Sequence, residues 1–377
     1  MPDPILDEIN LTTLKEIYPK KIADNFFADT PFQAYLRDHC LVPFGGGAFM
    51  QSTFLYKPMI GGAYAKGDTF NTTKRQTLAG VLFDPKYYYT AIPEYLEDVE
   101  VENKGDLAVF SLIDTDMTNA MQTISAIIAI DLAQHGQPSS ASIIGNRPKN
   151  LNGWIEAIND GVTPGWDGSR FANYGTQARN GTVGNTLNSI PLWVGDQSGN
   201  TGPITYNVLI ESYKDASVGR VRPNLGVGNK AAIAFCQERL QTQQRFTQER
   251  DPVWGVMGFR FEDAMILTDD YFPSKKYGVN DPDIGNYLTG TVDTTGMSPA
   301  ANSNFPASTV CTMGEVFCWF NTAKWLFRIS NSRVFGFGFS GFIPNPDNTK
   351  VVGQIKAMVN LECTGPKFQK QLLGIGS

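Results

Sequence analysis

The sequence predicts an α+β fold built from several structural units. Apolar residues recur at spacings of three and four through residues 106–135, which is typical of one long amphipathic helix. Aromatic and β-branched runs bounded by glycine and proline predict strands on both sides of this helix. A chain of 377 residues has room for two or three units of ordinary size, roughly 100–200 residues each. We find no repeat with a period of roughly 20–50 residues, which argues against a solenoid or a propeller.

Residues 1–40 are interpreted as an N-terminal arm with helical tendency. Thr30 is predicted as a helix N-cap and Pro31 as the first helical residue. Acidic residues outnumber basic ones in the arm, so it is not a basic arm for nucleic acid. A partial apolar stripe precedes this helix start (Leu11, Leu14, Ile17 and Ile22).

Residues 41–98 are predicted to contain an extended β-hairpin. Met50–Lys57 forms one side, and residues 78–83 and 87–92 supply the returning strands. A two-stranded hairpin is only marginally stable alone, so this one needs a surface to lie on. The hairpin is rich in basic residues (Lys57, Lys66, Lys74, Arg75 and Lys86, against Asp68 and Asp84), and an acidic run follows it (Glu94, Glu97, Asp98, Glu100 and Glu102). This charge pattern suits a self-complementary assembly, and a solvated loop followed by a solvated strand explains it equally well.

The helix predicted at residues 106–135 ends before Gly136 and Pro138. At 1.5 Å per residue it would be ~40 Å long, which suits a structural spine. Its apolar stripe is interpreted as core packing (Phe110, Ile113, Met117, Met121, Ile124, Ile128 and Leu132).

The remaining chain alternates between short elements and loops. Residues 161–202 and 278–310 are rich in Gly, Asn, Ser and Thr and predict loops, the second a surface insertion. We expect helices at 153–159 and 229–244 (the latter capped by Asn229) and strands at 206–211, 257–267 and 351–361. Residues 316–329 are strongly apolar and aromatic.

Composition excludes several classes of function. Charged residues make up 18% and aromatic residues 12% of the chain, and the formal net charge is −6, so the protein is neither disordered nor a basic nucleic-acid binder. Only two histidines occur, His39 and His135, which argues against histidine-rich metal sites and most histidine-dependent triads. The acidic N-terminus lacks the apolar core of a signal peptide, and no apolar run has the length of a membrane span. Five cysteines without a CxxC pair predict buried thiols of a reducing compartment (Cys40, Cys236, Cys311, Cys318 and Cys363).

Three motifs have simple structural interpretations. Gly226–Ala231 fits a loose G-x-G-x-x-A pattern, but charged and proline-containing residues precede it, so we interpret it as a turn and a helix cap. Asp269 and Asp270 are adjacent, would point to opposite faces of a strand, and are interpreted as turn residues. The tryptophans are interpreted as core residues rather than a carbohydrate platform (Trp154, Trp166, Trp193, Trp254, Trp319 and Trp325).

The order of arm, long hairpin, spine helix, α/β body and returning C-terminal strand resembles the major capsid protein of tailed bacteriophages, which has the Hong Kong 97-type fold. Residues 204–246 are similar to the family's strand, loop and helix ending in Gln-Arg-Phe. Residues 258–273 resemble its strand ending in Asp-Asp and an aromatic residue or Cys before proline. Residues 354–375 resemble its closing strand, with Asn360-Leu361 and then Pro366-Lys367. The resemblance covers nearly the whole chain and rests on order and spacing rather than on one motif.

The resemblance implies a domain division. Residues 41–98 would be the E-loop, which in this fold lies over a neighbouring subunit. Its expected inter-subunit contacts are Phe54, Tyr56, Lys57, Lys66, Lys74 and Arg75. The other units would be an N-terminal arm (1–40), a peripheral domain (99–145 with 345–377) and an axial domain (146–344, with 278–310 as its insertion loop).

The resemblance also implies a structural, non-enzymatic protein without cofactors or metals. It would self-assemble as hexamers and pentamers into an icosahedral shell enclosing phage double-stranded DNA, without sequence-specific binding. The acidic balance suits such a container, because binding phosphate requires an excess of Lys and Arg. Expected partners are other copies, a separate scaffolding protein, a portal protein and, as a further candidate, a decoration protein. The expected location is the virion, after assembly in the host bacterial cytoplasm and without a membrane.

Further expectations concern processing and alternatives. Only the short arm precedes the E-loop, so we expect no maturation cleavage. Some relatives form Lys–Asn cross-links; Lys57, Lys66 or Lys74 with Asn360 would be the candidates here, but we expect solvated lysines and no cross-links. One alternative is an encapsulin-like compartment of the same fold, which a cargo-tail peptide would identify. Another is a β-rich carbohydrate-binding protein, which would need a signal peptide and a carboxylate pair.

Overall fold

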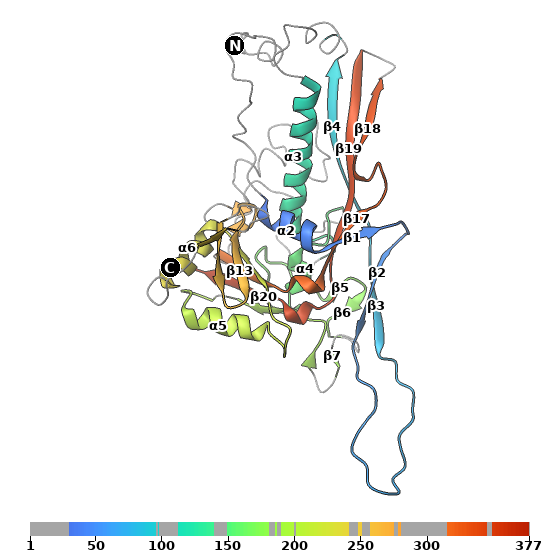
Figure 1. Cartoon of the computed structure of the whole chain (residues 1–377), viewed down its shortest axis with the longest axis vertical. Coiled ribbons are helices and arrows are strands. Elements are labelled where there is room, and N and C mark those ends of the chain that lie inside the picture. The colour runs from blue at the N-terminus through green and yellow to red at the C-terminus, as the bar shows by residue number, and fades with distance from the viewer. Residues whose placement is uncertain are drawn as a thin grey trace.

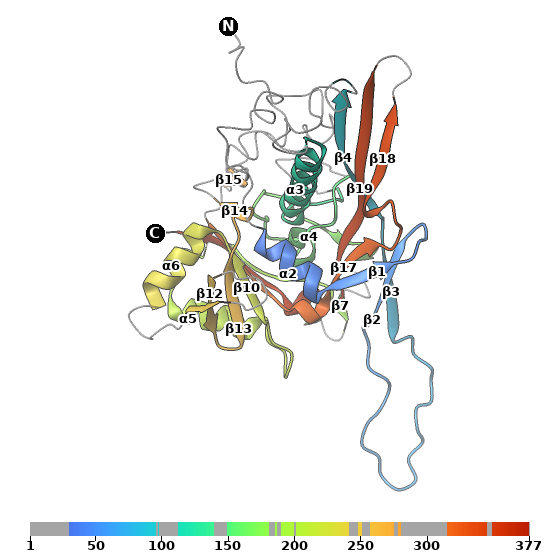
Figure 2. The same ribbon diagram turned by 45° about the horizontal axis from the view of Figure 1, so that its top comes forward.

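A computed structural model describes residues 30–95, 97, 112–138, 149–180, 185–186, 190–199, 201–240, 248–250, 257–274, 278–279, 315–344 and 349–376. Figure 1 shows helix α3 standing beside strands β4, β19 and β18, a body that carries α5 and α6, and the β2–β3 hairpin projecting away from both. The turned view in Figure 2 keeps the hairpin and the tall sheet on one side and the body on the other. The helices are α2 (Pro31–His39), α3 (Leu112–Leu132), α4 (Trp154–Ile158), α5 (Tyr206–Asp215) and α6 (Lys230–Leu240).

A five-stranded sheet forms the tall part of the molecule. Its central strand is β19, which pairs antiparallel with β4 on one side, from Lys86 opposite Val359 to Tyr95 opposite Lys350, and with β17 and β18 on the other. The parallel strand β1 adds to β17. The strands are β1 (Leu41–Phe44), β4 (Lys86–Tyr95), β17 (Trp325–Ser330), β18 (Gly336–Pro344) and β19 (Lys350–Cys363).

A seven-stranded mixed sheet forms the body. Its order is β11 (Gln248–Arg250), β12 (Met257–Phe261), β13 (Ala264–Thr268), β10 (Leu225–Gly228), β16 (Glu315–Phe320), β20 (Lys370–Ile375) and β9 (Asp196–Ser198). Four two-stranded units complete the described part of the chain: β2 (Met50–Leu55) with β3 (Leu78–Phe83), β5 (Asn173–Tyr174) with β6 (Gln177–Ala178), β7 (Asn185–Thr186) with β8 (Ile190–Pro191), and β14 (Pro273–Ser274) with β15 (Gly278–Val279).

Strand β16 explains why the sequence around residue 316 is continuously apolar. Val316, Cys318 and Phe320 join the main core on one face of the body sheet. Phe317 and Trp319 join a second core beneath α5 and α6 on the other face. Because both faces of the strand are covered, no polar alternation is needed.

The spine helix confirms the predicted periodicity within the described residues. Helix α3 packs against β4 and β19. Ile124, Ile128 and Leu132 are completely buried, as expected of a core stripe. Met121, however, is 41% exposed, so the stripe is buried in the C-terminal half of the helix, and Met121 is not core. Residues 106–111 lie outside the described residues.

Other predictions are also confirmed. Strands occur within 257–267 and 351–361, and α4 lies within 153–159. The described tryptophans are buried, as predicted for core residues, and the described cysteines are buried free thiols. Trp254, Cys311 and nearly all of the 278–310 insertion lie outside the described residues.

Three corrections concern local structure, and the first is the segment at residues 206–211. It was predicted as a strand but begins helix α5. The Thr205 hydroxyl accepts a hydrogen bond from the Val208 N–H at 3.3 Å, which caps the helix. Leu209 and Tyr213, four residues apart, are both buried. The cap and the helical spacing therefore outweigh the strand-like composition of the segment.

The second correction concerns the glycine motif. The predicted cap is confirmed, since the Asn229 Oδ1 accepts the Ala232 N–H at 2.7 Å. The predicted turn is wrong, because residues 225–228 form the buried strand β10 between β13 and β16. A Cβ at Gly226 would lie 2.9 Å from the Phe317 and Trp319 rings, so only glycine fits beneath them. The strand was missed because it is only four residues long and charged residues precede it.

The third correction is the extent of the hairpin. Only β2 and β3 pair with each other. Residues 87–92, predicted as a returning strand of the hairpin, belong to β4, and β4 pairs with β19 instead. The hairpin is therefore shorter than predicted, because the partner of β4 lies more than 250 residues away in sequence.

The Asp269-Asp270 turn is confirmed and has an additional role. Asp269 accepts the Tyr271 N–H at 2.8 Å, as in an Asx turn. Its other oxygen accepts the Phe32 N–H at 3.0 Å and so caps α2 from a distant part of the chain. Thr30, the predicted cap, makes no side-chain capping bond. Burial raises the pKa of Asp269 to about 6.

Candidate assembly interface

The foot of the hairpin, strands β2 and β3, is part of the main core. Met50, Val81 and Phe83 are buried, and residues between them are more exposed. This alternation puts one face of both strands against the body. The foot is therefore held by the hydrophobic core of its own chain.

The β5–β6 turn clamps the foot. Gly175 has a φ of +59°, and a Cβ there would lie 2.3 Å from a Val81 methyl group. The Gln177 side-chain amide donates to the Gly80 carbonyl at 2.7 Å, and the Leu82 N–H donates to the Thr176 hydroxyl at 3.2 Å. Glycine is required at 175 both for its backbone conformation and for this close approach.

Two side chains of β2 add polar and aromatic contacts. The Ser52 hydroxyl donates to the buried Glu362 carboxylate at 2.5 Å. The Phe54 ring stacks on Trp193, with ring centroids 4.0 Å apart and planes at 8°. These contacts fix the direction in which the hairpin leaves the body.

The hairpin tip, residues 56–77, contains no strand and extends away from the body (Figure 1). The Asp68 carboxylate accepts the Ala65 N–H at 2.6 Å, and Gly67 has a φ of +96°, which together form a turn. Tyr64 and Phe70 contact each other with centroids 5.0 Å apart, yet they are 69% and 63% exposed. Exposed apolar side chains grouped in this way make the tip a candidate binding surface.

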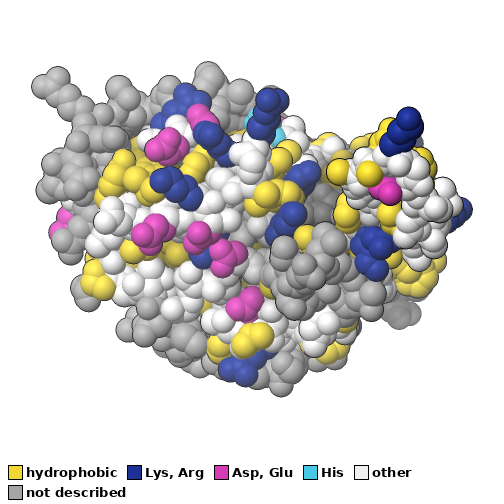
Figure 3. Space-filling view, turned by 90° about the horizontal axis from the view of Figure 1, so that it is seen from below, with side chains coloured by type: hydrophobic (Ala, Val, Ile, Leu, Met, Phe, Trp, Pro, Cys, Tyr) yellow, Lys and Arg dark blue, Asp and Glu magenta, His cyan; other side chains and the backbone are white. Residues whose placement is uncertain are grey.

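The tip also carries positive charge. Lys66, Lys74 and Arg75 are exposed, and Lys57 lies 5.3 Å from the Tyr56 ring centroid. Figure 3, which looks at the molecule from below, shows hydrophobic and basic side chains together on the projecting end at the right. The tip is thus both apolar and basic.

The six contact residues expected from the sequence fall into two groups. Phe54 stacks within its own chain and Tyr56 is only 7% exposed, so both already have intramolecular surroundings. The four basic residues lie on the tip, and of these Lys57 is half-buried and the others are exposed. Contact with a second subunit stays a prediction for all six.

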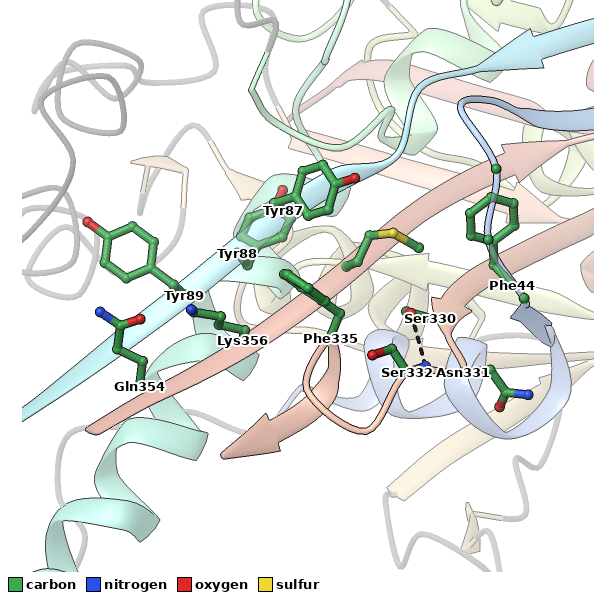
Figure 4. Close-up of a pocket in the computed structure, with 14 residues that line it drawn as sticks. Phe44, Tyr87, Tyr88, Tyr89, Ser330, Asn331, Ser332, Phe335, Gln354 and Lys356 are labelled. Atoms are coloured by element: carbon green, nitrogen blue, oxygen red, sulfur yellow. Dashed lines mark hydrogen bonds between the residues drawn. The ribbon is translucent and has the colours of Figure 1, made fainter. Parts of the chain in front are cut away.

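An open groove of about 960 Å³ lies on the face of the tall sheet, beside the loop that joins β17 to β18. Figure 4 shows side chains from β4, β19, this loop and the end of β1 around it. Tyr87 is 61% and Tyr89 49% exposed, and the Tyr87 and Phe335 ring centroids are 5.8 Å apart. Lys356 is the charged side chain in the lining, which holds no carboxylate.

Sequence analysis missed this groove. Tyr87-Tyr88-Tyr89 was a visible signal, since alternate residues of a strand face opposite sides. Tyr88 also borders the groove, but its hydroxyl is directed to Asp131, to which it donates at 2.6 Å. Which tyrosines line the groove depends on the pairing of β4 with β19.

Asn360, the residue considered for cross-linking, lies inside the protein. It is completely buried, and its amide donates to the Asp84 carbonyl at 2.7 Å and to the Asn152 side chain at 3.0 Å. Its side-chain oxygen accepts the Asn152 N–H at 2.9 Å. A lysine from another subunit cannot reach this amide without displacing buried structure.

Two further properties concern only the part of the chain that the structure describes. There, no group of three or more His, Cys, Asp or Glu side chains is placed to hold a metal ion. None of the helices described has the length and apolar character needed to cross a membrane.

Solved structures share this architecture at low sequence identity. The chain aligns with the capsid protein of cyanophage A-1(L) over 97% of its own length and 100% of that chain, with 9% identity and a TM-score of 0.59. It aligns with the capsid of a native GTA particle over 97% of both chains, with 7% identity and a TM-score of 0.57. The mature capsid of bacteriophage PhiM1 matches with 8% identity over 95% and 91% of the two chains, with a TM-score of 0.52.

The chain has the Hong Kong 97-type capsid fold. The fold expected from the sequence is thereby confirmed, whereas the domain boundaries stay predictions. No protein-family model matches the sequence. No curated protein matches it either. The fold is thus shared with these capsid proteins over nearly the full chain, although only 7–9% of the aligned residues are identical.

Proposed function

We propose that this protein is the major capsid protein of a tailed bacteriophage and assembles as hexamers and pentamers into a shell around double-stranded DNA. The observation that carries the proposal is the hairpin: its foot is locked into the core, while its tip exposes apolar and basic side chains. An element of this kind gains stability only when a second surface covers it. The fold shared with phage capsids supports the same role.

We further propose that the tip contacts the tyrosine groove of another copy. Tyr64 and Phe70 would bury apolar area there, and the Lys and Arg side chains of the tip would lie over the Tyr87 and Tyr89 rings. The absence of carboxylates from the groove lining makes aromatic faces, rather than ion pairs, the receiving groups. Of the six expected contacts, Lys57, Lys66, Lys74 and Arg75 would then act directly, and Phe54 and Tyr56 would position the tip.

The remaining assignments follow from the same proposal. The domain division is a 1–40 arm, a 41–98 E-loop, a 99–145 and 345–377 peripheral domain, and a 146–344 axial domain. The partners are a scaffolding protein, a portal protein and, as a further candidate, a decoration protein. The role is structural and not enzymatic, and the location is the virion. The net charge of −6 suits a container that releases its DNA.

Sedimentation velocity on the purified protein, with negative-stain imaging of fast fractions, tests the proposal. The protein would be produced alone and together with the neighbouring genes of its genome, which would supply a scaffolding protein. Closed shells, or rings of five or six, are expected under at least one condition. A monomer under both conditions would overturn the proposal.

Nuclease protection separates the two shell functions. Shells isolated from their natural source should hold double-stranded DNA that resists added nuclease. Shells that hold a folded enzyme and no DNA would instead establish the encapsulin-like alternative.

A further inference from the structure

The end of the spine helix and the start of α4 meet backbone to backbone. A Cβ at Gly136 would lie 2.2 Å from the Asn150 carbonyl oxygen. A Cβ at Gly153 would lie 2.3 Å from the Gln134 carbonyl oxygen. The turn after α3, residues 133–137, therefore packs against the segment that begins α4 without space for a further side-chain carbon. We name this contact the spine junction.

Glu156 lies on α4 inside the spine junction and is completely buried. One of its carboxylate oxygens accepts the N–H groups of Gly136 and Gln137, the second at 3.1 Å. The other oxygen accepts the Asn152 side-chain amide at 2.7 Å. A single side chain thus joins the turn after α3 to α4.

The charged and titratable groups around Glu156 come from several elements. Lys86 of β4 donates to the Gly136 carbonyl at 3.5 Å, and burial lowers its pKa. Arg179 of the β5–β6 unit donates to the carbonyls of Phe171, Trp193 and Glu156, and burial lowers its pKa to about 10. The charge of Asp84 acts on Lys86 and favours its charged form. The charge of Glu156 acts on Tyr174, whose pKa is raised mainly by burial.

His135 lies in the turn itself. Its Nδ1 is 2.9 Å from the Gln137 carbonyl oxygen, and its Nε2 is 3.6 Å from Asp167. It is a second ionisable side chain at the spine junction.

Burial dominates the titration of Glu156. The three N–H donors and the Lys86 charge favour the carboxylate, but removal from water outweighs them and raises the pKa of Glu156 to about 7. Below about pH 7 the closed junction therefore keeps a proton on Glu156 that a hydrated carboxylate would have released near pH 4.5.

We propose that Glu156 makes the spine junction a proton-sensitive latch: the closed junction keeps a proton on Glu156, and loss of this proton favours an opened junction in which water reaches the carboxylate. The latch lies next to the hairpin foot. Arg179 donates to the carbonyl of Trp193, whose ring stacks on Phe54, and the Gln137 side chain donates to the Asn173 carbonyl of β5 at 3.0 Å. Opening would thus loosen the contact between the spine and the base of the hairpin. This inference does not depend on the proposed function.

Hydrogen–deuterium exchange of the turn at residues 133–137, followed by mass spectrometry of the full-length protein, tests the latch. After division by the intrinsic exchange rates, protection is expected to fall about tenfold between about pH 6 and about pH 8. The direction follows from linkage, because an opened junction with an ordinary carboxylate binds fewer protons. Equal or greater protection at the higher pH would overturn the proposal, and this comparison needs no variant.

Two variants identify the titrating group. Glu156→Gln keeps the size of the side chain but cannot ionise, so the pH dependence should disappear and protection should stay near the wild-type value at about pH 6. Glu211→Gln on the exposed face of α5 is the matched control and should retain the tenfold change. A tenfold change that survives in Glu156→Gln would assign the effect to His135 and overturn the proposal. The exchange measurement uses purified protein, so it stands whether or not shells form.

Discussion

The foot and the tip of the hairpin are continuous in sequence but opposite in environment. In the foot, Val81 is completely buried and glycine at 175 is held against it. In the tip, Tyr64 and Phe70 are mostly exposed, and Gly67 has nothing near its missing Cβ. The foot therefore specifies the fold of the monomer, and the tip is available for contacts between monomers. This division teaches that stability of the chain and assembly of the shell can be changed separately.

The largest expected effect is on the foot. Gly175→Val places a β-branched side chain at a positive φ and against Val81, so we expect it to destabilise the protein by about 3–4 kcal/mol. Gly67→Ala, also at a positive φ but in open space, should cost about 1 kcal/mol. Urea unfolding of both variants measures the difference. If both variants lost a similar free energy of unfolding, the foot would be no more important for the stability of the monomer than the tip.

The next effect is the pH dependence of stability next to the foot. The pKa of Glu156 is about 7 in the folded protein, above its ordinary value of 4.5. Its contribution is fully present below about pH 4.5 and is lost as pH rises through 7, amounting to roughly 3 kcal/mol. The free energies of unfolding of wild type and Glu156→Gln should be similar below about pH 4.5. Above about pH 7 they should differ, because the wild type then loses this contribution and the variant does not. Parallel curves would contradict the assignment.

The tip should affect assembly and not folding. We expect Tyr64→Ser with Phe70→Ser to change the free energy of unfolding by less than about 0.5 kcal/mol, because neither side chain is buried. Shell yield measured by sedimentation velocity should fall severalfold. Val162→Ser removes a 76% exposed side chain from the body and is the matched control, which should assemble normally. Normal assembly of the tip variant would remove the tip from the interface.

The smallest effect concerns the tip charges. Lys66→Ala with Arg75→Ala should leave unfolding unchanged. Because a basic tip is attracted to a subunit whose net charge is −6, the two substitutions should slow assembly by about two- to fivefold at low salt, and the difference should shrink at high salt. Light scattering during assembly at two salt concentrations measures this. A salt-independent defect would show that the side chains act by packing rather than by charge.

Much of the fold was predictable where the signal is local. The spine helix follows from apolar residues spaced at three and four, and the cap at Asn229 follows from residue type and position. The basic tip was also visible, because Lys66, Lys74 and Arg75 occur in a stretch without strong strand signals. The groove was not predictable, since Tyr87 and Tyr89 face it only because β4 pairs with β19.

The sequence by itself determined the α+β class, the long spine, the order of the elements and the sparsely charged composition, because periodicity, caps and composition act over a few residues. Only the tertiary structure decided that β4 leaves the hairpin for β19, that residues 206–215 form a helix, and that Glu156 lies buried beneath the end of the spine. The physical reason is the same in each case. Strand pairing and burial depend on partners far away in sequence, and a local pattern does not record which partner takes up the hydrogen bonds or removes the water.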